Sequence, residues 1–130
     1  MDIGEIVMIL LLNGSPRKHG TTAIILKYIS EQLEKQGLKT NMIHVSDLKL
    51  QYCIGCCKCY ETGRCIFTDD IEHLSSEIEK ADGIIIGTPT YASNISGQSK
   101  TVIHRGHFVI EQSLHKRYAM SVVTYENYGG

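Results

Sequence analysis

Continuous apolar runs alternate with amphipathic segments along the chain. The runs at residues 6–12 and 83–87 contain no polar position, and they predict strands that are buried on both faces of a parallel sheet. Two further segments, residues 39–45 and 119–124, predict shorter strands. Apolar side chains at helical spacing predict three helices between the strands, at residues 22–36, 71–80 and 99–114.

The predicted order of elements is strand, helix, strand, cysteine-rich loop, helix, strand, helix, strand. Such alternation is typical of an α/β protein whose parallel strands are joined by right-handed crossovers. We therefore expect a three-layer α/β/α doubly wound sheet, with residues 1–130 forming a single domain. A sheet of this class commonly has about five parallel strands. Because the sequence predicts four, we interpret the chain as C-terminally truncated, without the last strand and helix.

Composition and charge narrow the classes of partner. The chain has 130 residues with 13 basic and 14 acidic side chains, and its formal net charge of −1 does not suit a protein that mainly grips nucleic acid. The apolar run at residues 6–12 is far shorter than a membrane-spanning helix, and Asp2 and Glu5 stand where a signal peptide would carry positive charge. We therefore expect a cytoplasmic protein with reduced thiols and with no membrane or nucleic-acid partner.

A polar loop at residues 13–22 follows the first predicted strand and opens the first predicted helix. The first amides of a helix lack intrahelical partners and attract phosphate groups, so this loop is a candidate anion site. It lacks the Gly-Lys-Ser/Thr ending of a P-loop and the G-x-G-x-x-G dinucleotide fingerprint, and an ordinary strand-to-helix turn is the alternative. The side chains that could donate hydrogen bonds or positive charge to an anion are Ser15, Arg17, Thr21 and Thr22.

Two further polar loops, at residues 88–97 and 125–130, follow the third and fourth predicted strands. Ligands of open α/β sheets bind beyond the carboxyl ends of the strands, at the topological switch point. These loops and residues 13–22 are rich in Gly, Ser, Thr, Asn and Tyr, which suits a polar and planar ligand. We expect all three loops to meet at one edge of the sheet.

All five cysteines lie within residues 53–65, in the sequence CIGCCKCYETGRC. In a reducing compartment such a cluster favours metal binding or redox chemistry over a disulfide framework. Four-cysteine zinc sites usually separate their two C-x2-C pairs by a longer insert than the one found here. Gly55 and Gly63 give the backbone freedom that wrapping several ligands around one metal centre requires. A metal cluster, a zinc ion and a redox-active or inert group of thiols all stay open.

These motifs together resemble the flavodoxin-like NAD(P)H-dependent FMN reductase family, over essentially the whole chain. Residues 14–17 and 20–22 look like the phosphate loop of that family, residues 89–97 are similar to its isoalloxazine loop, and residues 125–130 take the place of its next flavin-facing loop. The resemblance implies a flavodoxin-like fold. It also implies that FMN contacts Ser15, Arg17, Thr21, Thr22, Pro89, Thr90, Tyr91, Asn94, Ser96, Gly97, Glu126 and Asn127.

The cysteine segment resembles the compact motif of the iron-sulfur flavoproteins, a branch of this family. The resemblance implies a 4Fe-4S cluster that exchanges electrons with FMN, and four thiolates are what such a cluster requires. Cys57 falls outside the spacing and is interpreted as a bystander. The cluster ligands implied by the resemblance are Cys53, Cys56, Cys59 and Cys65.

The resemblance implies an FMN-dependent oxidoreductase that passes electrons from NAD(P)H, or from a redox protein, to an acceptor. Hydride from a nicotinamide would reach the flavin near Tyr91 and Asn94. Members of the family commonly pair their subunits, so we expect a homodimer or a larger homo-oligomer. A non-catalytic FMN-binding electron carrier or redox-sensing module is the main alternative, and a zinc-stabilised binding domain is another. The net charge of −1 favours the reductase, because a flavodoxin-like carrier is typically strongly acidic.

The helix predicted at residues 99–114 carries His104, His107 and Glu111 at spacings close to one turn. Such spacings arise easily on a polar helix face, so we interpret these side chains as a solvent-exposed or subunit-contact face rather than a metal site. The neighbouring Arg105 is given no role. No catalytic acid or base is assigned from the sequence.

Overall fold

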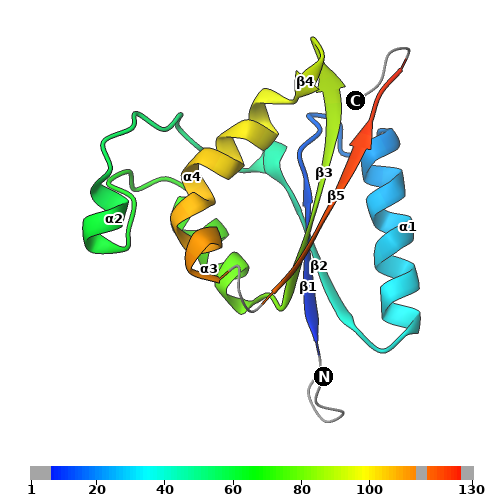
Figure 1. The fold of residues 1–130 in the computed structure, drawn as a ribbon. Coiled ribbons are helices and arrows are strands. Elements are labelled where there is room, and N and C mark those ends of the chain that lie inside the picture. The colour runs from blue at the N-terminus through cyan, green and yellow to red at the C-terminus, as the bar shows by residue number, and fades with distance from the viewer. Residues whose placement is uncertain (1–6, 114–116, 127–130) are drawn as a thin grey trace.

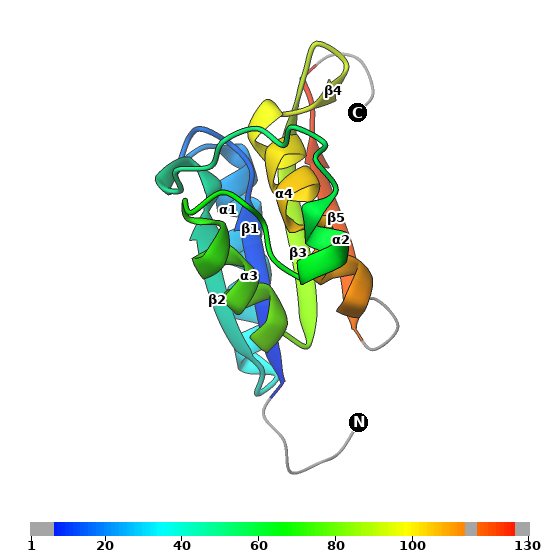
Figure 2. The same ribbon diagram turned by 90° about the vertical axis from the view of Figure 1, so that its left-hand side faces the viewer.

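The computed structural model describes residues 7–113 and 117–126, and it contains the doubly wound sheet that the sequence predicts. Four parallel strands, labelled in Figure 1, occur in the order β2-β1-β3-β5, which Figure 2 shows face on. A short strand, β4, pairs antiparallel with the end of β3. The strands are β1 (Met8–Asn13), β2 (Lys39–His44), β3 (Gly83–Tyr91), β4 (Asn94–Ile95) and β5 (Tyr118–Thr124).

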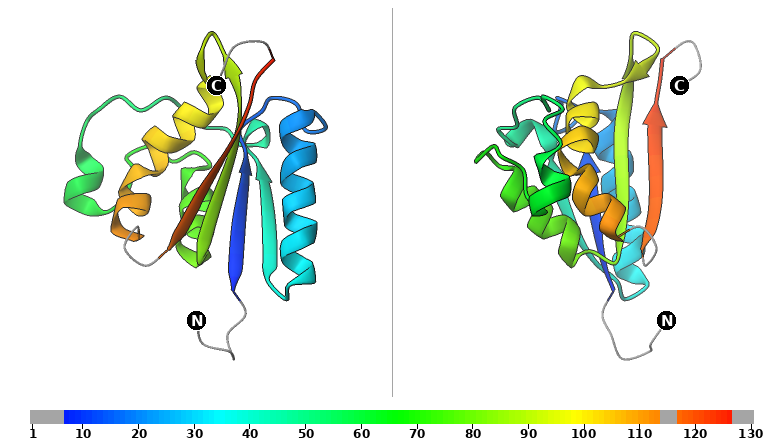
Figure 3. Two further views of the ribbon diagram at one scale, coloured as in Figure 1. Left: turned by 45° about the vertical axis from the view of Figure 1, so that its right-hand side comes forward. Right: turned by 60° about the vertical axis from the view of Figure 1, so that its left-hand side comes forward.

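Helices cover both faces of the sheet. Helix α1 packs on one face, whereas α3 and α4 lie side by side on the other, which gives the three layers expected (Figures 1 and 3). A short helix, α2, stands on the far side of α4 from the sheet, within the protruding loop that carries the cysteines (Figure 1). The helices are α1 (Thr21–Lys35), the 3-10 turn η1 (Val45–Asp47), α2 (Lys58–Thr62), α3 (Ile71–Lys80) and α4 (Gly97–Ser113).

The apolar runs of β1 and β3 fill two cores, one beneath each helical layer. Successive residues of a strand point to opposite faces, so Leu10 packs beneath α3 and α4 while Leu11 packs beneath α1. Both side chains are fully buried, which explains why the run at residues 6–12 shows no alternation of apolar and polar positions. This packing fixes the strand register and places the loops after β1, β3 and β5 at one edge of the sheet (Figure 1).

The end of β3 differs from the sequence-based expectation. The strand continues to Tyr91, although the sequence predicts a loop from residue 88 onward. The reason is a tight hairpin, in which the last two residues of β3 pair with the two residues of β4. Ala92 and Ser93 form its turn with φ angles of 48° and 62°, the conformation of a two-residue hairpin turn.

The stretch at residues 46–68, which the sequence predicts to be irregular, contains α2 and part of η1. Helix α2 has only five residues, too few for a recognisable helical pattern. It begins after Cys57, whose φ angle is 61°, and it ends at Gly63, whose φ angle is 71°. Gly63 therefore supplies the left-handed backbone conformation that commonly ends a helix.

Asp69 and Asp70, the two residues before α3, play different parts at its N-terminus. Asp70 occupies the N-cap position, but its side chain makes no capping hydrogen bond. Its Oδ2 instead accepts a hydrogen bond of 2.6 Å from the amide of Lys49, across the base of the cysteine loop. The Ile71 amide donates to Asp69 Oδ1 at 3.2 Å, so the residue before the N-cap satisfies one of the free amides of the first turn.

The remaining boundaries agree closely with the prediction. Helix α4 begins at Gly97 rather than Ser99, and its predicted end at Leu114 lies outside the described residues, as does the predicted start of the first strand at Ile6. Gly37 follows α1 with a φ angle of 86°, as expected of a helix stop. In the part of the chain that the structure describes, no helix is both long and apolar enough to cross a membrane.

Candidate functional site

The loop after β1 is held in a fixed shape by its own polar groups. The Ser15 amide donates to Asn13 Oδ1 at 3.1 Å, and Ser15 Oγ accepts from the Arg17 amide at 3.1 Å. The Gly14 amide donates to the Gly87 carbonyl at 2.8 Å and so ties the loop to β3. These bonds present the N-terminus of α1 at the carboxyl edge of the sheet.

The N-terminus of α1 has free backbone amides that could bind an anion. Gly20 is its N-cap and uses no side chain, and the first intrahelical bond runs from the Ile24 amide to the Gly20 carbonyl at 3.0 Å. The amides of residues 21–23 precede that bond and can donate to an anion, helped by the positive end of the helix dipole. No acidic side chain lies in the first turn of α1 to oppose a phosphate.

The three loops at the carboxyl edge enclose a cavity of about 490 Å³. Its walls come from the loop after β1, the end of β3 and the segment after β5, which is the arrangement expected from the sequence. A hydrogen bond of 2.9 Å between Thr22 Oγ1 and Thr124 Oγ1 ties α1 to β5 beside it. The cavity has the size of a small-molecule site. Eight of the predicted flavin contacts line it: Ser15, Arg17, Thr21, Thr22, Pro89, Thr90, Tyr91 and Glu126.

Ser96, another predicted flavin contact, makes hydrogen bonds that join elements of the protein. Its side chain is buried, and Ser96 Oγ donates to the Gly14 carbonyl at 2.6 Å. Ser96 Oγ also accepts from the Ser99 amide at 3.1 Å, and the Ser96 amide donates to Thr88 Oγ1 at 3.1 Å. The hydroxyl therefore joins the β1 loop, β3 and α4, and it is engaged within the protein.

Gly97 and Asn94, two more predicted flavin contacts, do not line this cavity. Gly97 lines a neighbouring hollow of about 370 Å³, which shares the side chain of Tyr91 with the first cavity. Asn94 is exposed in β4, and its Oδ1 accepts a hydrogen bond of 2.8 Å from the next amide. Asn127 lies outside the described residues.

The five cysteines line a second cavity of about 220 Å³, between the protruding loop and α4. All five are free thiols: Cys59 and Cys65 are half-buried, and Cys53, Cys56 and Cys57 are exposed. Among the described residues, no three His, Cys, Asp or Glu side chains lie close enough together to hold a metal ion. The structure thus brings the thiols to one cavity without assembling them into a finished metal site.

The backbone of this loop depends on left-handed conformations. Gly55 and Gly63 have φ angles of 69° and 71°, so both glycines supply the freedom that the sequence analysis expects of them. The Cys57 thiol turns back and donates to the Gly55 carbonyl at 3.5 Å. Burial raises the pKa of the Cys59 thiol, against the opposing effect of nearby backbone hydrogen bonds.

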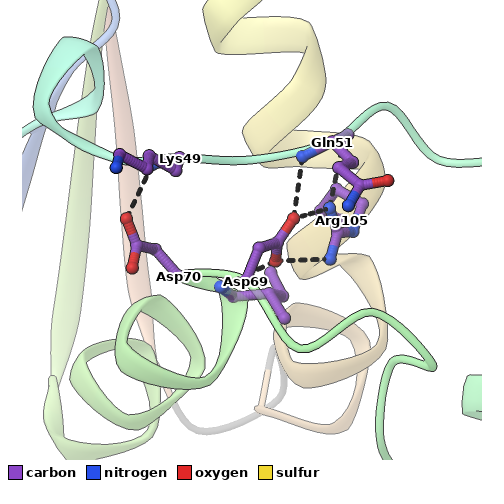
Figure 4. A network of polar contacts seen from close by, with 6 residues as sticks. Lys49, Gln51, Asp69, Asp70 and Arg105 are labelled. Atoms are coloured by element: carbon purple, nitrogen blue, oxygen red, sulfur yellow. Dashed lines mark hydrogen bonds and ion pairs between the residues drawn. The ribbon is translucent and has the colours of Figure 1, made fainter.

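A buried ion pair closes the base of the cysteine loop (Figure 4). Arg105, which is 2% exposed on α4, donates from Nη1 and Nη2 to the two carboxylate oxygens of Asp69, each at 2.8 Å. Arg105 Nη1 also donates to the Gln51 carbonyl at 2.6 Å, and the Gln51 amide donates to Asp69 Oδ2 at 2.8 Å. With the bond between Lys49 and Asp70, these contacts fasten both ends of the loop to each other and to α4.

The ion pair shapes the charge of both partners. Burial raises the pKa of Asp69, but hydrogen bonds from Arg105 and from the amides of Gln51 and Ile71 outweigh it and lower the pKa from 3.8 to about 2. The ring of Phe67 lies beneath the Arg105 guanidinium, 5.0 Å from Cζ to the ring centroid. Asp69 is therefore ionised at neutral pH. The contact between Arg105 and Asp69, called the clasp below, is thus an ion pair between two charged side chains.

The ion pair between Arg105 and Asp69 was not predicted, because no role was assigned to Arg105 from the sequence. A signal was nevertheless present, because residue 105 falls on the same helical stripe as Val102 and Val109, which are both buried. An arginine on the apolar stripe of a helix must find a buried partner. The pattern could have predicted that Arg105 is paired, although not that its partner is Asp69.

The parallel sheet and the ligand cavity at its carboxyl edge define a flavodoxin-like α/β protein. The family model for NADPH-dependent FMN reductase matches residues 7–130, and the chain belongs to that family. Its sequence is also similar to proteins named iron-sulfur flavoprotein. It is 39% identical over 127 residues to one from Clostridioides difficile, covering 95% of this chain and 56% of that protein. It is 35% identical over 120 residues to one from Archaeoglobus fulgidus, covering 89% and 53%.

The chain spans about half the length of the curated relatives it matches. Among solved structures, the NAD(P)H:quinone oxidoreductase from Methanothermobacter marburgensis superimposes with a TM-score of 0.64 at 12% identity, over 97% of this chain and 90% of that chain. A likeness at this low identity establishes the fold alone. It agrees with the flavodoxin-like sheet described above.

Proposed function

We propose that the chain binds FMN and acts as an oxidoreductase, which takes electrons from NAD(P)H, or from a redox protein, and passes them to an acceptor. The observation that carries this proposal is the cavity of about 490 Å³, where three loops meet beside the N-terminus of α1. It lies where doubly wound folds bind their ligands. Membership of the NADPH-dependent FMN reductase family supports both the flavin and the nicotinamide.

The residues around the cavity suit the parts of FMN. The phosphate would bind at the amides of residues 21–23, where the Thr21 hydroxyl and the exposed Arg17 guanidinium add donors. Tyr91, which is 44% exposed at the cavity wall, can pack beside the flavin ring. FMN supplies the hydride-transfer and electron-transfer chemistry when bound, and the chain supplies position, polarity and access.

A 4Fe-4S cluster held by Cys53, Cys56, Cys59 and Cys65 is the second part of the proposal. The donor set fits, because all four thiols face one cavity and four thiolates complete such a cluster. The thiols would have to draw closer together, which the exposed loop and its left-handed glycines permit. Similarity to proteins named iron-sulfur flavoprotein supports this part.

Assembly into a homodimer or a larger homo-oligomer stays an expectation, which light scattering would check.

Catalytic turnover separates the reductase from its main alternative. The chain, purified without oxygen and loaded with FMN, is mixed with NADH or NADPH and with ferricyanide as an artificial acceptor. A reductase consumes the nicotinamide in the steady state, and the rate depends on bound FMN. Bound FMN with almost no consumption would contradict the reductase and indicate an electron carrier or redox-sensing module.

The same preparation tests where the phosphate binds. The change Arg17→Ala should weaken FMN binding about tenfold or more, because a hydrogen bond to a charged group contributes roughly 1.5–3 kcal/mol. Lys18→Ala is the matched control, since Lys18 Nζ is already paired with Asp47 Oδ1 at 2.5 Å. The control should bind FMN like the wild type. Equal affinities for the two variants would contradict the placement of the phosphate.

A further inference from the structure

The side chain of His107, on α4, faces the cysteine cavity. Its half-buried ring lies 5.3 Å from the ring of Tyr60, which belongs to α2, and 6.2 Å from that of Phe108. The imidazole is thus held between α4 and the protruding loop, which lie next to each other in Figures 1 and 2. His107 lines the same cavity as all five cysteines.

The hydrogen bonds of His107 define which ring nitrogen carries the proton. Nδ1 lies 2.7 Å from the carbonyl oxygen of His104, and a carbonyl can only accept, so Nδ1 must carry a proton. In the neutral ring Nε2 then bears a lone pair. Nε2 is 3.8 Å from Cys59 Sγ, so the lone pair is directed at a thiol of the cavity.

This is the arrangement that metal-binding histidines use. A ligating imidazole almost always donates its other N–H to a backbone carbonyl or a carboxylate, which fixes the tautomer and the ring orientation. Three thiolates and one imidazole form a common tetrahedral donor set for Zn²⁺. The sequence analysis interprets His107, with His104 and Glu111, as part of an exposed helix face rather than a metal site. His107 differs from that interpretation, because its ring turns towards Cys59 of the loop.

We propose that His107 Nε2 is a metal donor of the cysteine cavity, and that it binds a soft divalent cation together with Cys59 and further thiolates of the loop when no iron-sulfur cluster is present. Each thiol that ligates the cation loses its proton to solvent, while the imidazole binds in its neutral form. The inference rests on the proposed metal-binding role of the cysteines, and it is independent of the proposed flavin site.

Cobalt(II) is a suitable probe, because its visible bands distinguish four sulfur ligands from three sulfurs and one nitrogen. The full chain is reduced, freed of iron with a chelator and titrated with Co²⁺ under anaerobic conditions. The variant His107→Phe keeps an aromatic ring between Tyr60 and α4 but has no donor. His104→Ala is the matched control, since it removes a neighbouring imidazole and keeps the carbonyl that holds His107.

The wild type and His104→Ala should show the mixed sulfur and nitrogen spectrum with equal affinity. His107→Phe should bind Co²⁺ more weakly and with shifted visible bands, by at least the ten- to hundredfold that the loss of a partner behind a metal ligand costs. Unfolding curves would verify that all three proteins are folded. Identical spectra and affinities for the wild type and His107→Phe would overturn the inference and leave the thiols as the ligands.

The result also stands apart from the cluster proposal. A wild type that binds no Co²⁺ would overturn the inference and count against the metal-binding role of the cysteines. Cobalt binding that depends on His107, in a chain whose anaerobic preparation contains no iron and no sulfide, would support the inference and contradict the proposal of an iron-sulfur cluster. The two proposals therefore fail in distinguishable ways.

Discussion

Replacing Arg105 by methionine is expected to lower the free energy of unfolding by about 3–5 kcal/mol. Breaking a buried ion pair by removing one partner leaves the other charge buried without compensation, which is costly. In the wild type Arg105 makes three hydrogen bonds, two to Asp69 and one to the Gln51 carbonyl, and its side chain is 1% exposed. Urea denaturation of the wild type and the variant at neutral pH would measure the loss.

Two controls separate the clasp from a general loss of charge. Lys58→Met removes an exposed cation of the same loop, whose ion pair with Glu61 is solvated, and it should change stability by less than about 1 kcal/mol. The double change of Arg105→Met with Asp69→Leu should be less damaging than Arg105→Met alone, because no charge is left buried. A loss within 1 kcal/mol for Arg105→Met would contradict the clasp.

The stability that this ion pair contributes should also depend on pH. The pKa of Asp69 lies at about 2 in the folded chain, below its usual value of 3.8, so the unfolded chain takes up the proton first as the pH falls. The stabilisation by Asp69 is complete above about pH 4 and is lost as the pH falls towards about 2. The difference between the wild type and Arg105→Met should therefore shrink over that range, because a protonated Asp69 no longer needs its partner.

Replacing Gly14 by alanine is expected to cost about 1–3 kcal/mol in unfolding free energy and to weaken FMN binding strongly. A Cβ at this position would lie 1.8 Å from Ser99 Oγ and 2.9 Å from the Gly87 carbonyl oxygen, so buried side chain and backbone must both shift. The shift would displace the loop that presents α1 to the phosphate. Denaturation curves and an FMN titration would measure both effects.

Gly97→Ala is the control for this change. A Cβ at Gly97 meets nothing within 4 Å, and the residue begins α4 without a left-handed conformation, so stability should change by less than about 0.5 kcal/mol. Gly14→Ala with unchanged stability would show that the loop can move away from β3 at little cost. The fixed shape argued for the β1 loop would then be wrong.

The fold could be predicted from the sequence, because strands that are buried on both faces appear as continuous apolar runs. The run that contains Leu10 and Leu11 has no polar position, and a parallel sheet is the usual reason. The hairpin after β3 could not be predicted, because Ala92 and Ser93 lack the Asn-Gly signal of such turns. Their left-handed conformation follows from the pairing of β3 with β4, which a local pattern does not reveal.

The candidate site was predictable only as far as topology decides it. Loops that follow parallel strands meet at one edge of the sheet, so the cavity wall containing Thr22 and Tyr91 could be expected. The side-chain partners could not. Ser15 and Ser96 look alike in the sequence, yet Ser15 lines the cavity while the Ser96 hydroxyl binds the Gly14 carbonyl.

Pairings across the cysteine loop were equally hidden. Arg105 and Asp69 are 36 residues apart, and His107 and Cys59 are 48 residues apart. No spacing rule links such positions, because the path of the loop between them decides which side chains meet. The sequence shows where thiols are concentrated, and the fold shows which helix they face.

The flavin, iron and sulfide content of the chain, purified without exposure to oxygen, tests both proposed cofactors at once. We expect bound FMN together with about four irons and four sulfides per chain. A preparation with flavin but without iron would contradict the cluster. A chain that binds no flavin, even after FMN is added, would contradict the proposal that the three loops form an FMN site.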